Sequence, residues 1–502
     1  MAMGNKSVEF PRKVIFIELN EVPFKIIDNF IRQNPTSDLA LALPKFHQYL
    51  THIDDKVLSP WISWPTLHRG VPAHRHGISN LGENLTLLDQ QFPPIWQILS
   101  RHGVKTGVLG SLHSSPLPQK PENYAFYLPD SFALSPDCIP AHLSSFQALN
   151  LSLASHSARN VSGMVPVRQS LELLTNVRRL GILPSTLVAL VRQLGLERLK
   201  PYRKNRRRTY QAVLHFDLFF KQLKEIRPDF ATCFTNHVAS AMHRYWAAAF
   251  PEDYQNFGFS SAWVARYRDE IDFALGQFSR FLGRLIHFVQ QNPSYMLWIT
   301  SSMGQSATTA NPILRQLYLT QPAKLMGTLG VPDHAWKPQK AMLPITSIWV
   351  NTPWRESVRK ALNSLTIKGV RVTVDEKADG FFSVHLDNKN LVTSKTTQAV
   401  IQGQAYGLLD LGLENVTIED QSGASAYHIP EGLLLIYDPL TQAVNHRRSC
   451  VSVLEIAPTL LELFNISVPD YMLPPSERGR LASDLVTKAN QLANQPATVA
   501  VS

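Results

Sequence analysis

Side chains that can carry chemistry are concentrated in residues 61–78, which read WISWPTLHRGVPAHRHGI. The segment holds three His, two Arg, two hydroxyl residues and two Trp. These types can supply general bases, nucleophilic hydroxyls and cations that bind anions. Charged and amphipathic side chains are seldom massed in a buried turn, so the composition favours a functional loop over one that only packs against a sheet.

Other parts of the chain combine an apolar run, expected to be a strand, with polar residues at its end. They are residues 13–23 (KVIFIELNEVP), 228–246 (PDFATCFTNHVASAMHRYW), 298–305 (WITSSMGQ) and 427–439 (YHIPEGLLLIYDP). In α/β enzymes the ligand site lies outside the carboxyl ends of such strands. We therefore expect these ends to meet in one site.

One motif in residues 61–78 is specific enough to suggest a family. It is a Thr-Leu-x-x-Gly turn followed, six residues after the Gly, by His-Gly-Ile, formed by Thr66, Leu67, Gly70, His76, Gly77 and Ile78. A His before a Pro-Glu-Gly turn, His428, is the second match. Over most of its length the chain resembles the alkaline phosphatase superfamily, in its type I phosphodiesterase and nucleotide pyrophosphatase branch. The resemblance implies a three-layer α/β/α sandwich with a mostly parallel sheet and two insertions.

The same resemblance implies two divalent cations, usually zinc, but several of the family's ligands are replaced. Asn20 stands where the family has its first Asp, and Ser302 and Met303 stand where it has an Asp-His pair. Each lost carboxylate removes roughly 4 kcal/mol of attraction to a nearby cation at an effective dielectric near 20. We expect one ion or none, with zinc the preferred metal.

For the remaining ion, the resemblance assigns His243 and His428 as ligands. The Asp that the family pairs with the first of these falls at Ala239, and His237 is the candidate substitute. A lone His is more often a satisfied structural residue than a ligand, so a structural role is the alternative.

The nucleophile expected from the resemblance falls at Pro60, which has no hydroxyl. Ser59 and Ser63 are the two candidate replacements. The roles expected for the other site residues are charge neutralisation by His68 or Arg69, hydrogen bonding or substrate binding by Asn20, Thr66 and Ser302, and stacking on a sugar or base by Trp61 and Trp64.

Length and composition agree with a large α/β enzyme. The chain has 502 residues, 44% of them apolar, and three Cys without metal-binding or disulfide spacing. No secretory signal or membrane-spanning run is evident, so we expect a soluble, cytoplasmic protein. The oligomeric state stays open.

The net charge is +10, and part of the excess lies in residues 203–208 (RKNRRR), beside helical residues 165–195. This placement makes a peripheral contact with an anionic membrane one candidate interaction, and a solvated charge run the alternative. No reader motif accompanies the charge, so no nucleic-acid partner is expected.

Pattern changes along the chain divide it into alternating core and inserted parts. We expect core at 1–130, 218–310 and 415–488, a helical insertion at 131–217, a second insertion with a β-hairpin at 311–414, and a disordered tail at 489–502. Within the core, residues 262–289 predict one long helix.

Two functions follow from these observations. The first is a hydrolase or transferase for a phosphoester or related anionic ester, on a small-molecule, lipid-linked or saccharide substrate, with a reduced metal site. The second is a catalytically inactive binding or regulatory protein that retains the phosphodiesterase-like cleft.

Overall fold

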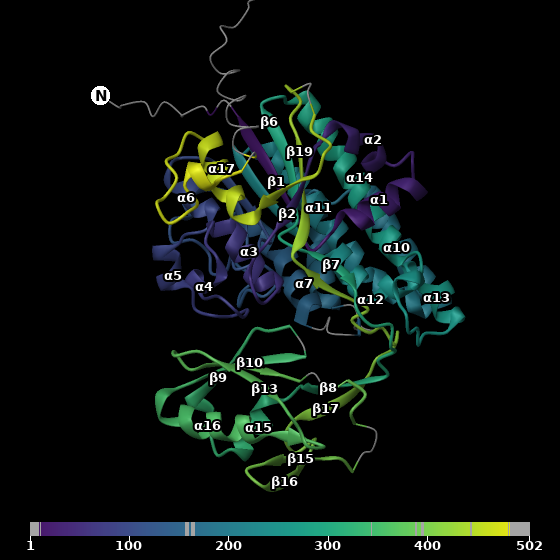
Figure 1. Cartoon of the computed structure of the whole chain (residues 1–502), viewed down its shortest axis with the longest axis vertical. Coiled ribbons are helices and arrows are strands. Elements are labelled where there is room, and N and C mark those ends of the chain that lie inside the picture. The colour runs from purple at the N-terminus through teal and green to yellow at the C-terminus, as the bar shows by residue number, and fades with distance from the viewer. Residues whose placement is uncertain are drawn as a thin grey trace, which may run out of the picture.

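The computed structural model describes residues 10, 12–155, 160–161, 166–342, 344–386, 389–392, 396–441, 444–479 and 481. They form a large α/β core and, below it in Figure 1, a smaller β-rich domain. The tail expected at residues 489–502 lies outside the described residues.

The core is built on an eight-stranded sheet in the order β20-β2-β19-β6-β1-β5-β3-β4. Its strands are β1 (Lys13–Leu19), β2 (His47–His52), β3 (Thr106–Leu109), β4 (Tyr124–Leu128), β5 (Phe230–Thr235), β6 (Tyr295–Thr300), β19 (Glu431–Tyr437) and β20 (Ser449–Ser452). Only β19 runs antiparallel to its neighbours, β2 and β6. The expected mostly parallel sheet is confirmed.

Burial on both faces explains why these strands read as continuous apolar runs. In β1, Ile15 and Ile17 pack into one hydrophobic cluster, and Val14 and Phe16 pack into another on the opposite face. Successive strand residues point to opposite faces, so both helical layers are anchored by one strand.

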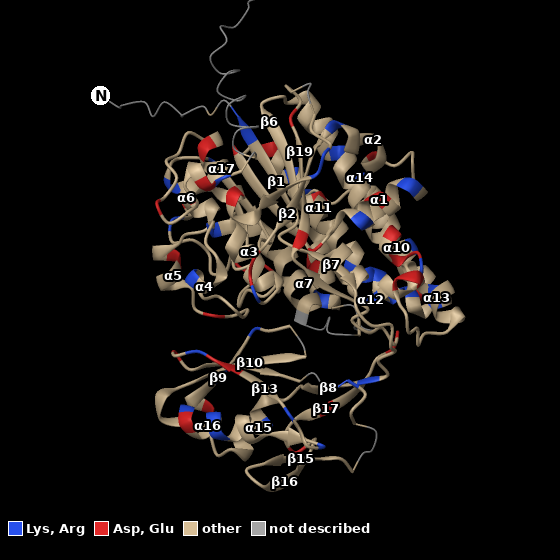
Figure 2. Cartoon of the chain, in the orientation of Figure 1, with Lys and Arg blue, Asp and Glu red and all other residues tan. Residues whose placement is uncertain are grey.

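Helices cover both faces of the sheet and complete the three-layer sandwich (Figure 1). One layer contains α1 (Phe24–Gln33), α11 (Arg207–Ile226), α12 (His237–Ala249) and α14 (Glu270–Gln291), and the other contains α3 (Pro60–Arg69), α6 (Ile95–Arg101) and α17 (Ile456–Leu463). Basic and acidic residues are interspersed over these layers (Figure 2).

Two expectations from the sequence were wrong at the level of single elements. The long helix expected over residues 262–289 is two helices, α13 (Ser261–Tyr267) and α14, separated at Arg268 and Asp269. The motif segment expected to be too polar for the core forms α3, in which even Arg69 is 1% exposed. Its polar groups are buried because each finds a partner, as described below.

The smaller domain has its own hydrophobic cluster, which runs from Leu317 to Leu413. Its strands are β8 (Arg315–Leu319), β9 (Trp336–Gln339), β10 (Ile345–Val350), β11 (Thr366–Ile367), β12 (Val370–Arg371), β13 (Thr373–Glu376), β14 (Phe381–His385), β15 (Gln398–Ile401), β16 (Gln404–Gly407) and β17 (Leu413–Thr417), and its helices are α15 (Pro322–Thr328) and α16 (Thr352–Ser364). β13 and β14 pair as an antiparallel hairpin.

A helical segment, α7 (Ser144–Ser155), α8 (Val167–Thr175), α9 (Val177–Leu180) and α10 (Pro184–Leu199), lies within the range expected for the first insertion. None of the helices in the described part of the chain is both long and apolar enough to cross a bilayer.

Candidate metal centre

Strand direction brings the candidate site residues to one edge of the sheet. β1, β5 and β6 are parallel, so the residues that follow them, including Asn20 and Ser302, lie at the same edge. Because β19 is antiparallel to β6, it begins where the others end. This places His428, in the preceding strand β18 (Ala426–Ile429), at that edge too.

Three side chains at this edge of the sheet converge as a candidate ligand set: Glu21, His243 and His428. One donor atom from each lies within 4.8 Å of the other two, and they are the single group of this kind in the described residues. Glu21 Oε2 lies 2.9 Å from His243 Nε2 and 3.4 Å from His428 Nε2. The edge of the sheet therefore carries two imidazoles and one carboxylate around a common point.

Backbone carbonyls orient both imidazoles. His243 Nδ1 lies 2.8 Å from Ala426 O, and His428 Nδ1 lies 2.8 Å from Leu58 O. A carbonyl can only accept, so each Nδ1 donates and each Nε2 is turned toward Glu21. Such contacts to the other ring nitrogen are typical of metal-bound His.

Glu21 is held in place by its backbone and by its neighbours. Its φ of 59° is in the left-handed region, which non-glycine residues rarely adopt. Asn20 Nδ2 donates to its Oε1 over 2.8 Å, and Gln305 Nε2 donates to its Oε2. The carboxylate is therefore held toward the two His rather than left free to rotate.

Electrostatics keep the Glu21 carboxyl ionised. Burial by itself raises the pKa of Glu21, but His428 and His243 outweigh it and hold that pKa well below its usual value. Burial lowers the pKa of His428, and the neighbouring carboxylate outweighs this and raises it. A positive charge between the three donors, whether a proton or a metal ion, is thus favoured.

The donor set fits a divalent cation. Two His and one Glu with a fourth position open is a known arrangement for catalytic zinc. Gln305 Oε1 is a further oxygen beside the three donors, buried and without a hydrogen-bond partner in the described part of the chain. The residues present therefore suit one ion.

The positions that the motif resemblance assigns to further metal ligands carry neutral groups that hydrogen-bond to other side chains. Ser302 Oγ lies 2.8 Å from Ser63 Oγ, and both residues are buried. Asn20 Oδ1 accepts from Trp64 Nε1 over 2.8 Å. These uncharged pairs offer no compensation for a second dication.

Ser59 lies beside the metal centre, immediately before α3. It follows Leu58, the residue whose carbonyl oxygen binds His428. The Ser59 hydroxyl is buried and has no hydrogen-bond partner among the described residues. It is an available hydroxyl at the amino end of a helix, where developing negative charge is stabilised.

His68 and Arg69, expected to neutralise substrate charge, are buried and engaged elsewhere. His68 Nε2 lies 3.0 Å from Glu18 Oε1, and its ring packs between Trp64 and Trp96. Arg69 pairs with Asp89 over 2.8 Å. Neither contacts the three-residue centre, so their proposed roles stay predictions.

His237 and Thr66 are likewise bonded away from the centre. His237 lies with Nδ1 2.6 Å from Thr235 Oγ1 and Nε2 3.1 Å from Ala274 O. Thr66 Oγ1 contacts Asp55 and His76, so the motif residues stabilise the turn after α3. Trp61 is half-buried, and its carbonyl oxygen lies 3.0 Å from His113 Nε2.

Glu21 is the site residue that the sequence did not single out. The available signal was an acidic residue directly after Asn20, one position beyond the place of the family's Asp. Its use depends on a left-handed backbone conformation, which the sequence pattern did not reveal.

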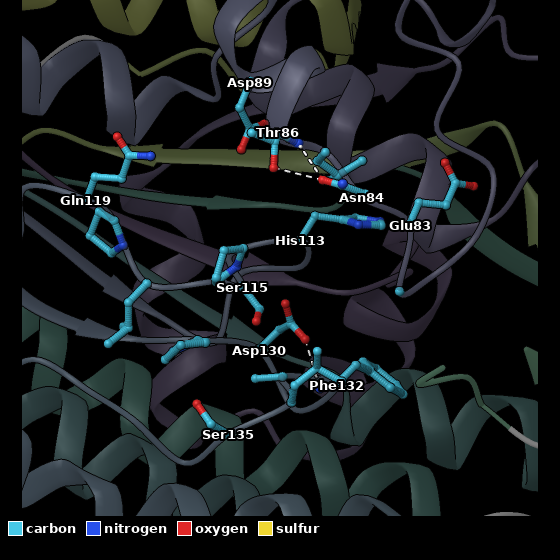
Figure 3. Close-up of a pocket in the computed structure, with 18 of the residues that line it drawn as sticks. Glu83, Asn84, Thr86, Asp89, His113, Ser115, Gln119, Asp130, Phe132 and Ser135 are labelled. Carbon is cyan, nitrogen blue, oxygen red and sulfur yellow. Dashed lines mark hydrogen bonds between the residues drawn. The ribbon is translucent and has the colours of Figure 1, made fainter. Parts of the chain in front are cut away.

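A cavity of about 1140 Å³ lies between the core and the smaller domain. Figure 3 shows His113, Ser115 and Asp130 around it, opposite Asn84 and Thr86. Burial lowers the pKa of His113 to about 3 and raises the pKa of Asp130 to about 6. Since Trp61 contacts His113, the cavity wall and the start of α3 are connected.

Comparisons with known proteins give structural likenesses only. No family model and no curated protein matches the chain. Among solved structures, the chain is similar to murine ectonucleotide pyrophosphatase/phosphodiesterase 5, at 12% identity and a TM-score of 0.39, over 95% of this chain and 99% of that one. The chain is also similar to phosphonoacetate hydrolase from Sinorhizobium meliloti 1021, in complex with phosphonoacetate. The identity is 13% and the TM-score 0.39, over 93% of this chain and 98% of that one.

Alkaline phosphatase from the Antarctic bacterium TAB5 gives 9% identity and a TM-score of 0.37, over 92% of this chain and 100% of that one. These proteins are members of the alkaline phosphatase superfamily, the group that the motifs of this chain resemble. At such scores the likeness does not extend to substrate or activity, so function is argued from the site.

Proposed function

We propose that the chain is a phosphoester hydrolase or transferase that works with one divalent cation, zinc being the preferred ion, at Glu21, His243 and His428. The observation that carries this proposal is the convergence of two imidazole nitrogens and one ionised carboxylate from three distant parts of the chain. A buried acid pointed at two oriented His is costly unless it serves to hold positive charge.

The bound cation would polarise the phosphoryl oxygen and stabilise the charge that develops on it. Ser59 supplies the attacking hydroxyl, because its Oγ has no hydrogen-bond partner among the described residues and the residue before it, Leu58, contacts His428. Asn20 and Ser302 act through hydrogen bonds rather than as ligands. Charge neutralisation by His68 or Arg69 stays a prediction, because His68 is hydrogen-bonded to Glu18 and Arg69 is paired with Asp89.

The proposed substrate is a small-molecule, lipid-linked or saccharide ester that carries a phosphate or a related anionic group. The cavity between the core and the smaller domain has room for the part of such a molecule that does not react. A cytoplasmic location and the absence of a nucleic-acid partner stay predictions.

The first test measures bound metal and turnover together. Purified protein is analysed for metal content and assayed with aryl phosphodiesters and monoesters in zinc, manganese and magnesium. We expect about one ion per chain. His243→Ala should abolish both binding and turnover, whereas Ser59→Ala should retain the ion and lose turnover by at least about a hundredfold.

His74→Ala is the matched control, because His74 is exposed and lies outside the centre. It should change neither metal content nor turnover. Full activity in His243→Ala, or stoichiometric metal that survives its loss, would contradict the proposed centre.

A binding or regulatory protein is the second candidate. It is favoured by the neutral hydroxyl and amide pairs that replace the second ligand set. This function predicts that neither metal nor turnover is detected, while phosphorylated ligands still protect the protein against thermal unfolding.

A further inference from the structure

The helical segment formed by α8, α9 and α10 presents apolar side chains to solvent. Six of its Leu and Val residues are between 55% and 79% exposed: Val167, Leu171, Leu174, Val188, Val191 and Leu199. Single exposed apolar residues are ordinary, but a group of this size within one helical segment of the chain marks an interaction surface. We call these six residues the apolar stripe.

Helical spacing places the stripe on one side of each helix. In α8, Val167, Leu171 and Leu174 are separated by four and three residues. In α10, Val188 and Val191 are three apart, and Leu199 follows eight residues later. Residues at such separations share a helix face.

The opposite faces of the same helices are already packed on the core. Leu173, Leu180 and Ile182 belong to its main hydrophobic cluster. On α10, Thr186 Oγ1 donates to Asp217 over 2.6 Å. The helices are therefore held in place by other residues, and the apolar stripe is not needed for their packing on the core.

Cations surround the stripe. Residues 166–200 contain six Lys and Arg (Arg168, Arg178, Arg179, Arg192, Arg198 and Lys200) against two acidic residues. Glu197, one of the two acids, is buried and paired with Arg207 over 2.6 Å. In the described part of the chain, none of the six cations forms an ion pair with a carboxylate.

We propose that this face docks on an anionic lipid bilayer. Leu and Val side chains that emerge between unpaired Arg residues match the boundary between acyl chains and anionic headgroups. The long Arg side chains can remain at headgroup level while the apolar stripe inserts. α10 lies on the outside of the core (Figure 1), and its stripe residues Val188, Val191 and Leu199 are exposed to solvent.

A partner protein or a second copy would bury the apolar stripe but would have to supply acidic groups for all six cations. An anionic bilayer supplies negative charge at any lateral position. The inference stands independently of the proposed activity, because no stripe residue contacts the metal centre.

Flotation with vesicles tests the proposal. The full chain is mixed with vesicles of phosphatidylcholine containing 30% phosphatidylglycerol, and with pure phosphatidylcholine vesicles. We expect binding to the first at least about tenfold stronger than to the second, and weakened by salt.

Two double variants separate the apolar and charged contributions. Val188→Ser with Val191→Ser, and Arg178→Glu with Arg179→Glu, should each reduce binding by at least about tenfold. The matched controls are Leu409→Ser and Arg371→Glu, exposed positions of the smaller domain, which should bind like the parent. Metal content, turnover and Tm should be unchanged in all four, because exposed substitutions have small effects on stability.

Three results would overturn the proposal. They are absence of vesicle binding by the parent chain, equal binding by the stripe variants and the controls, and a dimer that Val188→Ser with Val191→Ser dissociates in the ultracentrifuge without any vesicle binding. The last result would assign the face to self-association.

Discussion

At the scale of single residues, the metal centre depends on where one carboxylate is placed. The motif resemblance places Asn20 where an Asp is expected, and Glu21 follows it with a left-handed backbone. The longer side chain and the turned backbone bring its Oε2 within 2.9 Å of His243. The centre thus has a carboxylate one residue beyond the position at which the resemblance predicts one.

Replacing Glu21 by Gln tests this placement. We expect zinc to raise the Tm of the parent chain, because a ligand that binds only the folded state stabilises it by about 2.7 kcal/mol at a hundred times its Kd. In Glu21→Gln the increase should disappear, since the anionic donor is gone. Differential scanning fluorimetry with zinc and with a chelator measures the Tm of the parent chain and of the variant.

Glu431→Gln is the control for this experiment, because Glu431 also lies at this edge of the sheet but outside the centre. It should show the parent's response to zinc. An undiminished zinc effect in Glu21→Gln would remove Glu21 from the ligand set.

At the scale of elements, α3 shows how a polar sequence becomes a buried helix. Its His68 pairs with Glu18 of β1, its Arg69 with Asp89, and its Thr66 with Asp55. Each of these three side chains has a partner from another part of the chain, which offsets part of the cost of removing it from water. The motif residues position the loop that carries Ser59.

Gly304, the first residue of β7 (Gly304–Ala307), pairs with Ile429 of β18 and also lies close to the backbone of β19. A Cβ there would overlap the carbonyl oxygen of Glu431. We expect Gly304→Ala to lower the free energy of unfolding by about 2–4 kcal/mol through forced backbone shifts, and to weaken metal binding because His428 lies in β18. Urea unfolding and metal analysis measure the two effects.

Gly327→Ala, in α15, provides the contrast. A Cβ at this helical position meets nothing within 4 Å, so the substitution should be neutral or stabilising by about 0.5–1 kcal/mol. If both variants had the same stability, the close approach at Gly304 would not be a structural requirement.

At the scale of the whole molecule, buried histidines make stability depend on pH. Burial lowers the pKa of His76 and His113 to about 3, and that of His215 and His237 to about 4. Their folded pKa values lie below the unfolded value near 6.5. Their contribution to stability is therefore complete above pH 6.5 and is lost as the pH falls toward 3–4.

Asp130 acts in the opposite direction. Burial raises its pKa to about 6, so its contribution is present below its unfolded pKa and is lost as the pH rises through 6. Burial also raises the pKa values of Glu83 and Asp272. The four histidines outweigh these carboxyls, and the net expectation is acid destabilisation.

Between pH 7 and pH 5, each of these histidines should contribute about 2 kcal/mol of destabilisation. In the parent chain, the His215 ring stacks on Phe146, and its Nε2 has no hydrogen-bond partner among the described residues. His215→Phe therefore removes one buried histidine without breaking a hydrogen bond. We expect the loss in stability between pH 7 and pH 5, measured by urea unfolding, to shrink by about 2 kcal/mol. His74→Gln, at an exposed position, should show the same pH-dependent loss of stability as the parent chain. If His215→Phe also lost as much stability as the parent, the burial argument would be refuted.

The sequence by itself determined the elements with strong periodicity and the residues within a contiguous motif. The apolar runs at β1, β5 and β6 and the Thr66 to Ile78 motif were predictable, because burial on two faces and turn chemistry are local patterns. The mostly parallel sheet was expected from the family resemblance. The two helices over residues 261–291 were merged, since both have apolar residues at helical spacing.

Only the tertiary structure decided which polar groups meet. Glu21 and His428 lie more than four hundred positions apart in the chain, and their contact requires the antiparallel direction of β19 and a left-handed residue after β1. The burial of His68 and Arg69 likewise depends on acids from distant segments. Pairing between distant groups follows from strand order and backbone direction, which single residues do not encode.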